Sequence, residues 1–307
     1  MQSDKSIRKY TGFLSKEILY EIFAVIQENL VKINYWKGPG QFKEETGQSR
    51  RGRSKQKSDF DEYLITLIYI RKALGMDVLA ELFGVSKTYV SYVVTTWINI
   101  LYDIFHGQLK YPPAETVRKN LPETYPSKYS DTRIILDCTE FFTAKPKNCT
   151  AQAATYSSYK NHNTVKLLVG ITPTGLITFV SNVYGGCTSD RHIFEKEFLD
   201  KVEPGDAIMV DRGFNIADLL LEKKAKLYIP PFTRKKAGSD RKSLTQSEIA
   251  KTREIASLRI HVERAIERMK NYKLLSQTID ISLWPLLDQL MVIIAVLCNM
   301  EPPLLND

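Results

Sequence analysis

The chain has 307 residues, of which 43% are hydrophobic and 25% charged, and this is the composition of a globular protein with a sizeable core. Its formal net charge of +8 favours a polyanionic partner. The four cysteines include no CxxC pair and the four histidines are scattered, which argues against a zinc ribbon or finger and favours free thiols in a reducing compartment.

Two features argue against a membrane protein. The N-terminus lacks the apolar core of a signal peptide, and the longest wholly apolar run, Met291 to Cys298, is too short to span a bilayer. We therefore expect a soluble, intracellular protein without a membrane partner.

Residues 1–36 are predicted to form an N-terminal amphipathic helix. Apolar residues recur at helical spacing between Ser15 and Ile33, and Ser15 is placed to cap the helix. The apolar face must pack on the next domain or on a second copy, and the sequence does not decide between them.

Residues 37–58 are dominated by Gly, Ser, Gln and charged residues, so an exposed basic linker is predicted. Arg50, Arg51 and Arg53 lie within it. They are candidates for contacts to the DNA backbone and for a nuclear localisation signal, and a solvated flexible run is the alternative.

Residues 59–125 are predicted to contain a helix-turn-helix made from the last two of three helices. Gly75 ends the first helix, Asp77 caps the second, Gly84 lies in the sharp turn, and Ser86 caps the third. The exposed early positions of the third helix would face a DNA groove; they are Lys87, Thr88, Tyr89, Ser91 and Tyr92. The alternative is a small helical bundle that binds no DNA.

Residues 126–307 are predicted to form a mixed α/β domain, after proline-rich irregular chain over 108–130. A loop is expected over 145–161, and the strands over 163–172 and 176–182 are followed by alternating helices and strands. Arg234, Lys235 and Lys236 are candidate DNA contacts in a second basic loop. A long helix to about Lys270 and a last helix from Ser282 to Cys298 complete the core.

Two aspartates follow buried apolar runs in this domain. The stretch RIILDCTE predicts a short buried strand, Ile134 to Leu136, that ends at Asp137, and DAIMVDRGF repeats the pattern at Asp211. A buried carboxylate needs a basic side chain, backbone donors or a metal ion, because an unpaired buried charge costs several kcal/mol.

A third acid, Glu263, lies in RIHVERAIERMK, which has helical spacing, beside the predicted core stripe. Two aspartates at strand ends and a glutamate on a later helix are the oxygen ligands that a two-metal phosphoryl-transfer site requires. A surface pair between Glu263 and Arg259, one helical turn away, is the competing interpretation.

The motifs ILDCTE, YSSYKNHNTVKLLVGITPTG, GGCTSDRHI, VDRGF and RIHVERAIERMK occur in an order that resembles the DDE transposases of the PIF/Harbinger superfamily, over about Asp131 to Cys298. The resemblance implies a ribonuclease-H-like catalytic domain, in which the first and fourth strands are neighbours, preceded by an all-α helix-turn-helix domain.

The resemblance also implies that Asp137, Asp211 and Glu263 are catalytic and bind two Mg²⁺ or Mn²⁺ ions. Water would then cut double-stranded DNA at the terminal inverted repeats, and the freed 3′-hydroxyl would attack a target site in the nucleus. Lys160, Asn161 and His162 would contact phosphates or bases near the active site. Thr188 or Ser189 is expected to cap the helix that runs through Leu199, and Asp190 is interpreted as a helix cap rather than a ligand.

Other functions stay open at this point. A domesticated, catalytically silent DNA-binding protein would keep the fold, and a generic nuclease would cut without preference for repeat ends. Assembly as a homo-oligomer and use of a separate DNA-binding partner protein, as in some relatives, are also open.

Overall fold

The computed structural model describes residues 3–30, 33, 35–36, 56–123, 125–232, 234–235 and 242–304. The chain divides into two compact units: residues 1–107, 271–277 and 284–301 form a helical unit, and residues 108–270, 278–283 and 302–307 form a unit built on a sheet. Each unit is thus assembled from segments that are distant in sequence.

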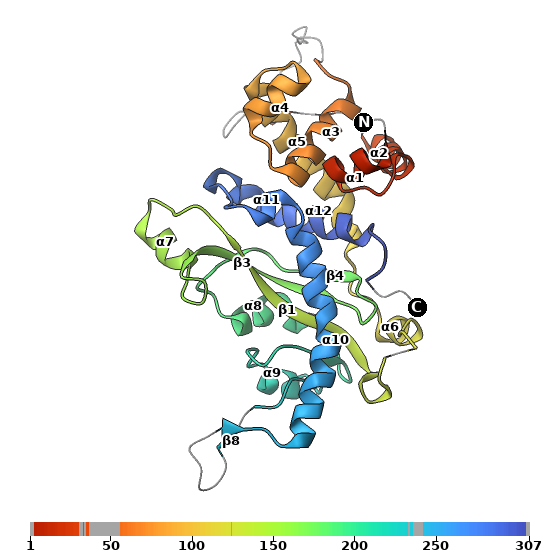
Figure 1. Cartoon of the computed structure of the whole chain (residues 1–307), viewed down its shortest axis with the longest axis vertical. Helices are drawn as coiled ribbons and strands as arrows, with labels where there is room; N and C mark the ends of the chain where they lie inside the picture. Colours follow the sequence, from red (N-terminus) through yellow and green to blue (C-terminus); the bar gives the residue numbers. More distant parts are fainter. Residues whose placement is uncertain are drawn as a thin grey trace. The chain divides into compact units, whose positions relative to one another are not determined.

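The helical unit is organised around α5, which contacts α2, α3, α4 and α12, whereas α1 and α11 pack on α3. Val90, Val93 and Trp97 of α5 are fully buried. The helices are α1 (Asp4–Thr11), α2 (Lys16–Asn29), α3 (Asp59–Lys72), α4 (Met76–Phe83), α5 (Lys87–Phe105), α11 (Lys273–Ser276) and α12 (Leu287–Asn299) (Figure 1).

Side-chain caps begin several of these helices. Ser15 caps α2 and Ser86 caps α5, as predicted. The prediction that Asp77 caps α4 is wrong, because α4 begins after Gly75 without a side-chain cap. Asp77 lies inside the first turn, where its negative charge still suits the positive end of the helix dipole.

The helix-turn-helix is formed by α4 and α5. Gly84 ends α4 with a φ of +61°, in the left-handed region that glycine adopts without steric cost. Leu79 and Ala80 of α4 are buried, and α4 contacts α5. The predicted turn is therefore present.

The last helix belongs to the helical unit rather than to the sheet unit, where the sequence analysis placed it. Its apolar residues pack on α5. Residues Ile281–Asn299, with a mean hydropathy of 2.0, are long and apolar enough to cross a membrane, but 56% of this stretch is buried inside the structure. A core helix passes the same test, so the stretch is weak evidence for a membrane contact.

A buried carboxylate joins three parts of the helical unit. Glu62 of α3 is fully buried, and its two oxygens accept hydrogen bonds from the hydroxyls of Tyr35 (2.8 Å) and Tyr89 and from Nε1 of Trp97 (2.9 Å). These donors compensate a charge that would otherwise be costly to bury. Glu62 thereby orients the first turn of α5 through Tyr89.

The sheet unit contains one mixed sheet whose main path has the order β2-β3-β1-β6-β7. β1 pairs antiparallel with β3 and parallel with β6, and β4 and β5 also pair with β3. Three antiparallel strands followed by parallel β6 and β7 form the ribonuclease-H-like arrangement that was predicted. The strands are β1 (Thr132–Phe142), β2 (Tyr156–Ser157), β3 (His162–Ile171), β4 (Ile177–Val180), β5 (Tyr184–Gly185), β6 (Ala207–Met209) and β7 (Lys226–Tyr228), with a separate hairpin of β8 (Arg234–Lys235) and β9 (Lys242–Ser243).

Helices accompany this sheet, and α8 and α9 supply residues to its core. The core combines Ile134 and Leu136 of β1 with Ile208 of β6 and Phe194 of α8, all of which are fully buried. The α-helices are α6 (Ala114–Lys119), α7 (Cys149–Thr155), α8 (Asp190–Glu197), α9 (Ala217–Glu222) and α10 (Gln246–Lys270), and short 3₁₀ turns cover His106–Gln108, Ser127–Tyr129, Leu199–Lys201 and Ile281–Leu286.

Three local predictions for this unit are wrong. The loop over 145–161 contains α7, which Asn148 caps, and strand β2, and the irregular chain over 108–130 contains α6. β1 does not end at Asp137 but continues to Phe142, because residues 137–142 keep their antiparallel pairing with β3. The sequence analysis missed these elements because they are short or because they depend on pairing with another strand.

The contact between Glu62 and Tyr89 can be tested by Tyr89→Phe. We expect the variant to lower the free energy of unfolding of the helical unit by about 1.5–3 kcal/mol, the contribution of a hydrogen bond to a charged group. All three tryptophans, Trp36, Trp97 and Trp284, belong to this unit, so urea unfolding followed by tryptophan fluorescence measures it separately.

Tyr92→Phe is the matched control. Tyr92 lies on the same helix and is half-buried, and among the described residues its hydroxyl has no hydrogen-bond partner. Its loss should change stability by less than about 0.5 kcal/mol. Equal effects of the two variants would contradict the structural role of Tyr89.

Candidate active site

The register of β1 and β6 places the two aspartates at the same level. The parallel pairing ends at Ile135 opposite Met209, and Asp137 and Asp211 each lie two residues further along. Side chains two residues apart on a strand share a face, so both carboxylates lie at the same level, two residues beyond the last β1–β6 pair. The predicted neighbourhood of the two strands is confirmed.

Helix α10 positions the third acid. Thr245 and Glu248 form the predicted capping box at its start, and the helix packs on β1 and β3. Val262 and Met269 are fully buried, whereas Glu263 lies beside this stripe and is exposed. Glu263 lines the same cavity as Asp137 and Asp211.

The three predicted acids line one cavity of about 670 Å³. Three further carboxylates and four basic side chains also line it. The carboxylates are Asp137, Glu140, Asp190, Asp211, Glu263 and Glu267, and the basic side chains are Lys160, Lys166, Arg259 and Lys270.

Arg259 lies between the two aspartates. Its side chain is 9% exposed, its Nη1 donates to Oδ1 of Asp211 at 2.9 Å, and its Nη2 donates to Oδ1 of Asp137 at 3.4 Å. The competing interpretation of Glu263 as the surface partner of Arg259 is therefore contradicted, because the guanidinium group is buried and donates to the aspartates instead.

The carboxyl group of Asp137 lies in an unfavourable place for a charge. Burial raises its pKa to about 6, the nearby guanidinium group of Arg259 opposes this rise, and the charges of Asp211 and Glu263 add to it. The ionised form thus depends on a positive charge in the cavity.

The donor set fits a hard divalent cation. Mg²⁺ and Mn²⁺ prefer carboxylate oxygens, and Asp137 and Asp211 already share one cationic group, the guanidinium of Arg259. In this conformation no group of three acidic, histidine or cysteine side chains among the described residues is close enough to hold a metal ion. In this structure the guanidinium group of Arg259 supplies the positive charge beside the two aspartates.

A second ion-pair group supports the cavity from β3. Nζ of Lys166 lies 3.1 Å from Asp190 and 3.5 Å from Glu140, and it donates to the carbonyl oxygen of Thr188 at 2.8 Å. Ser189, not Asp190, caps α8, so the interpretation of Asp190 as the cap is wrong. The sequence analysis did not single out Lys166, although a single charged residue within an apolar strand could have identified it.

The candidate DNA contacts at the start of β3 differ in their position relative to the cavity. Lys160 lines the cavity, with its ammonium group over the ring of Tyr159 at 4.7 Å. The ring of His162 packs edge-on against Phe142, and His162 is not among the residues that line the cavity. Sequence analysis did not single out Lys270, which also lines it.

The candidate DNA contacts of α5 differ in exposure. Lys87 and Thr88 are exposed, whereas Ser91, Tyr92 and Tyr89 are half-buried, and the hydroxyl of Tyr89 is bonded to Glu62. Arg234 and Lys235 form β8, which pairs with β9. Arg50, Arg51, Arg53 and Lys236 lie outside the described residues.

A ribonuclease-H-like sheet with clustered acids, accompanied by a helix-turn-helix, defines a class of DNA-processing proteins. Residues 136–299, more than half of the chain, match the family described as DDE superfamily endonuclease, and residues 58–106 match the helix-turn-helix of DDE superfamily endonuclease. The chain belongs to the DDE superfamily endonucleases. No curated protein and no solved structure matches it.

The role of Arg259 as the counter-charge can be tested by Arg259→Gln. Without a divalent ion, we expect the variant to lose about 1–3 kcal/mol of stability, because two neighbouring carboxylates lose their charged donor. Added Mn²⁺ should stabilise the variant more than the wild type. All tryptophans lie in the helical unit, so the unfolding of the sheet unit is followed by calorimetry instead. This measures both the loss of stability and the response to Mn²⁺.

Arg264→Gln on the same helix is the control, because Arg264 is exposed and does not line the cavity. It should leave both quantities unchanged. If Arg259→Gln responded to Mn²⁺ no more than the wild type does, Arg259 would not be standing in for a metal ion.

Proposed function

We propose that the chain is a DDE transposase of the PIF/Harbinger type. It cleaves double-stranded DNA at the terminal inverted repeats of a transposon and joins the 3′-hydroxyl to a target site. The observation that carries this proposal is the meeting of Asp137, Asp211 and Glu263 in one cavity, just beyond the last residues that pair β1 with β6.

In this proposal Asp137, Asp211 and Glu263 hold two Mg²⁺ or Mn²⁺ ions. When bound, the ions supply charge stabilisation for the attacking and leaving oxygens of an in-line displacement at phosphorus. Asp137 and Asp211 project from neighbouring parallel strands and Glu263 from a helix packed on the sheet, so the backbone fixes the spacing of the ligands.

The basic side chains of the cavity have a separate role. Lys160 and Lys270 line the same space as the acids, and burial lowers the pKa of Lys270, an effect to which the charge of Lys160 adds. Two ammonium groups that repel each other favour an anion between them. They hold phosphate oxygens of the DNA against the acids.

The helix-turn-helix brings the DNA to this site. Lys87 and Thr88, exposed in the first turn of α5, contact the groove, and Ser91 and Tyr92 flank them. The linker arginines Arg50, Arg51 and Arg53 add contacts to the backbone and direct the protein to the nucleus. We also propose that the protein assembles as a homo-oligomer and uses a separate DNA-binding partner protein. Either would bring the two ends of the transposon together.

A domesticated, silent protein is not favoured, because all three acids are retained and line one cavity. A generic nuclease would use the same site but cut DNA without repeat ends equally well. The choice of substrate in a cleavage assay separates these functions.

The proposed active site is tested by nicking of supercoiled DNA that carries the repeat ends, with Mg²⁺ or Mn²⁺. Asp137→Asn, Asp211→Asn and Glu263→Gln should each reduce cleavage by at least about a hundredfold, because an oxygen ligand loses its charge. DNA affinity should stay equal or rise, because a negative charge is removed from the cavity.

Glu267→Gln is the matched control for Glu263→Gln. Glu267 lines the same cavity one helical turn further along α10, and its loss should leave cleavage largely intact. Cleavage that survives Glu263→Gln but not Glu267→Gln would move the third ligand to Glu267. Cleavage that survives Asp137→Asn would remove the assignment of the triad.

The DNA contacts are tested by the salt dependence of binding. Neutralising Arg50, Arg51 and Arg53 together should flatten the plot of log affinity against log salt by about one unit for each phosphate that the variant no longer neutralises. Thr88→Ala should instead weaken binding to the preferred sequence with little change of slope. An unchanged slope for the triple variant would leave residues 37–58 as a spacer.

A further inference from the structure

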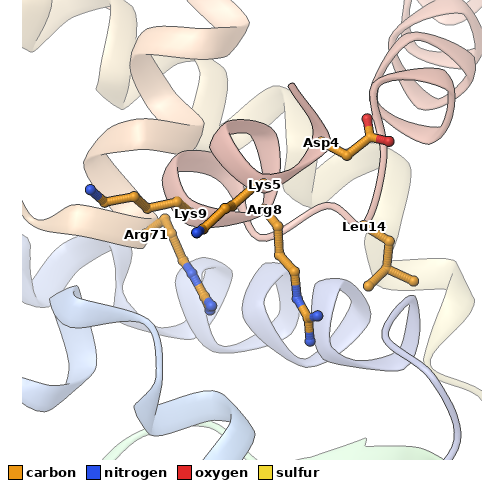
Figure 2. A pocket seen from close by; sticks show the side chains of 6 residues that line it. All are labelled: Asp4, Lys5, Arg8, Lys9, Leu14 and Arg71. Carbon is orange, nitrogen blue, oxygen red and sulfur yellow. The ribbon is translucent and has the colours of Figure 1, made fainter. Parts of the chain in front are cut away.

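The helical unit contains a second cavity, of about 470 Å³, between α1 and the last turn of α3. It is lined by one acid, one leucine and four basic side chains: Asp4, Lys5, Arg8, Lys9, Leu14 and Arg71. Figure 2 shows Arg8 and Arg71 extending in the same direction from their helices. The proposed function does not use this cavity.

The basic side chains of the cavity have no carboxylate partners in the described part of the chain. No ion pair joins Lys5, Arg8, Lys9 or Arg71 to an acid there. The carboxylate of Asp4 accepts a hydrogen bond from the backbone N–H of Lys16 at 3.0 Å, and Figure 2 shows it turned away from the cations. Within the described ranges, therefore, no acid compensates the positive charge of the cavity.

Arg71 is held in place by an aromatic ring rather than by an acidic partner among the described residues. Its guanidinium group lies over the ring of Tyr272 at 4.6 Å, and Tyr272 is buried. Nη1 of Arg71 is itself buried and has no hydrogen-bond partner among the described residues. A buried donor without an acceptor is destabilising, and an anion in the cavity would offset the positive charge of this guanidinium group.

Further positive charge surrounds the same place. The ammonium groups of Lys9 and Lys72 both lie near the ring of Tyr10, at 5.3 and 5.5 Å. Burial lowers the pKa of Lys72, and repulsion from Lys9, Arg71 and Lys273 lowers it further. The protein thus keeps like charges together at some cost in stability.

We propose that this cavity binds a phosphate group of the DNA backbone, as a contact separate from the groove-facing start of α5. Planar guanidinium groups match the paired oxygens of a phosphodiester, and the lysines add charge. The proposal rests on the proposed function, because that function supplies DNA as the phosphate source. A free phosphate compound is the other source of the same chemistry.

The test compares two variants of the full chain that each remove one positive charge from the helical unit. Arg8→Gln removes a cation of the cavity, and Lys16→Gln removes an exposed cation outside it. Fluorescence anisotropy with a labelled duplex of arbitrary sequence is measured over a series of KCl concentrations. Arg8→Gln should reduce the salt slope by about one unit and weaken binding severalfold, whereas Lys16→Gln should match the wild type.

A second measurement identifies the phosphate source. Inorganic pyrophosphate is titrated while the unfolding of the helical unit is followed by tryptophan fluorescence, which also shows that Arg8→Gln is folded. If Arg8→Gln abolishes stabilisation by pyrophosphate but leaves the salt slope for DNA unchanged, the ligand is a free phosphate compound and the proposal is overturned.

Two other results are decisive. If Arg8→Gln and Lys16→Gln behave alike towards both probes while the wild type nicks DNA, the cavity proposal fails and the proposed function stands. If the wild type neither binds nor nicks DNA, the proposed function fails and the DNA contact at the cavity fails with it. A reduced slope for Arg8→Gln alone supports the contact.

Discussion

The ion pairs of Arg259 with Asp137 and Asp211 are the interaction on which the candidate active site depends. Adjacent parallel strands bring the two carboxylates to one level, and α10 adds Glu263 to the same cavity. Like charges at such close range repel strongly in a partly buried place. A buried guanidinium group donates hydrogen bonds to both aspartates, so a residue of the long helix offsets part of this repulsion.

In the helical unit, too, a buried charge is compensated by nearby donors, but here the donors are neutral. Glu62 is buried, and neutral donors from Tyr35, Tyr89 and Trp97 satisfy it, so one carboxylate holds the first turn of α5 to α3. In contrast, the cations around Arg71 have no such compensation within the described residues. Charges that are satisfied internally stabilise the fold, whereas charges left unpaired at a cavity are available to a ligand.

The predictions that succeeded rest on signals that are local in sequence. Ser15 and Ser86 cap their helices because a serine hydroxyl reaches a backbone N–H only three residues away. The acids at Asp137 and Asp211 were found because apolar runs precede them. The predictions that failed concern short elements such as α7, the extension of β1 to Phe142, which depends on its pairing with β3, and the cap of α4.

The sequence alone determined the fold class and most of the long elements, and it predicted the three acids as a site, because apolar periodicity, caps and turn residues act within a few positions of the chain. Only the tertiary structure decided which charges meet. Arg259 could have paired with Glu263 one turn away, yet it faces the aspartates because α10 packs that side on the sheet. Tyr89 turns to Glu62, and α12 joins α5, for the same reason: burial and satisfied polar groups are settled by partners that are distant in sequence.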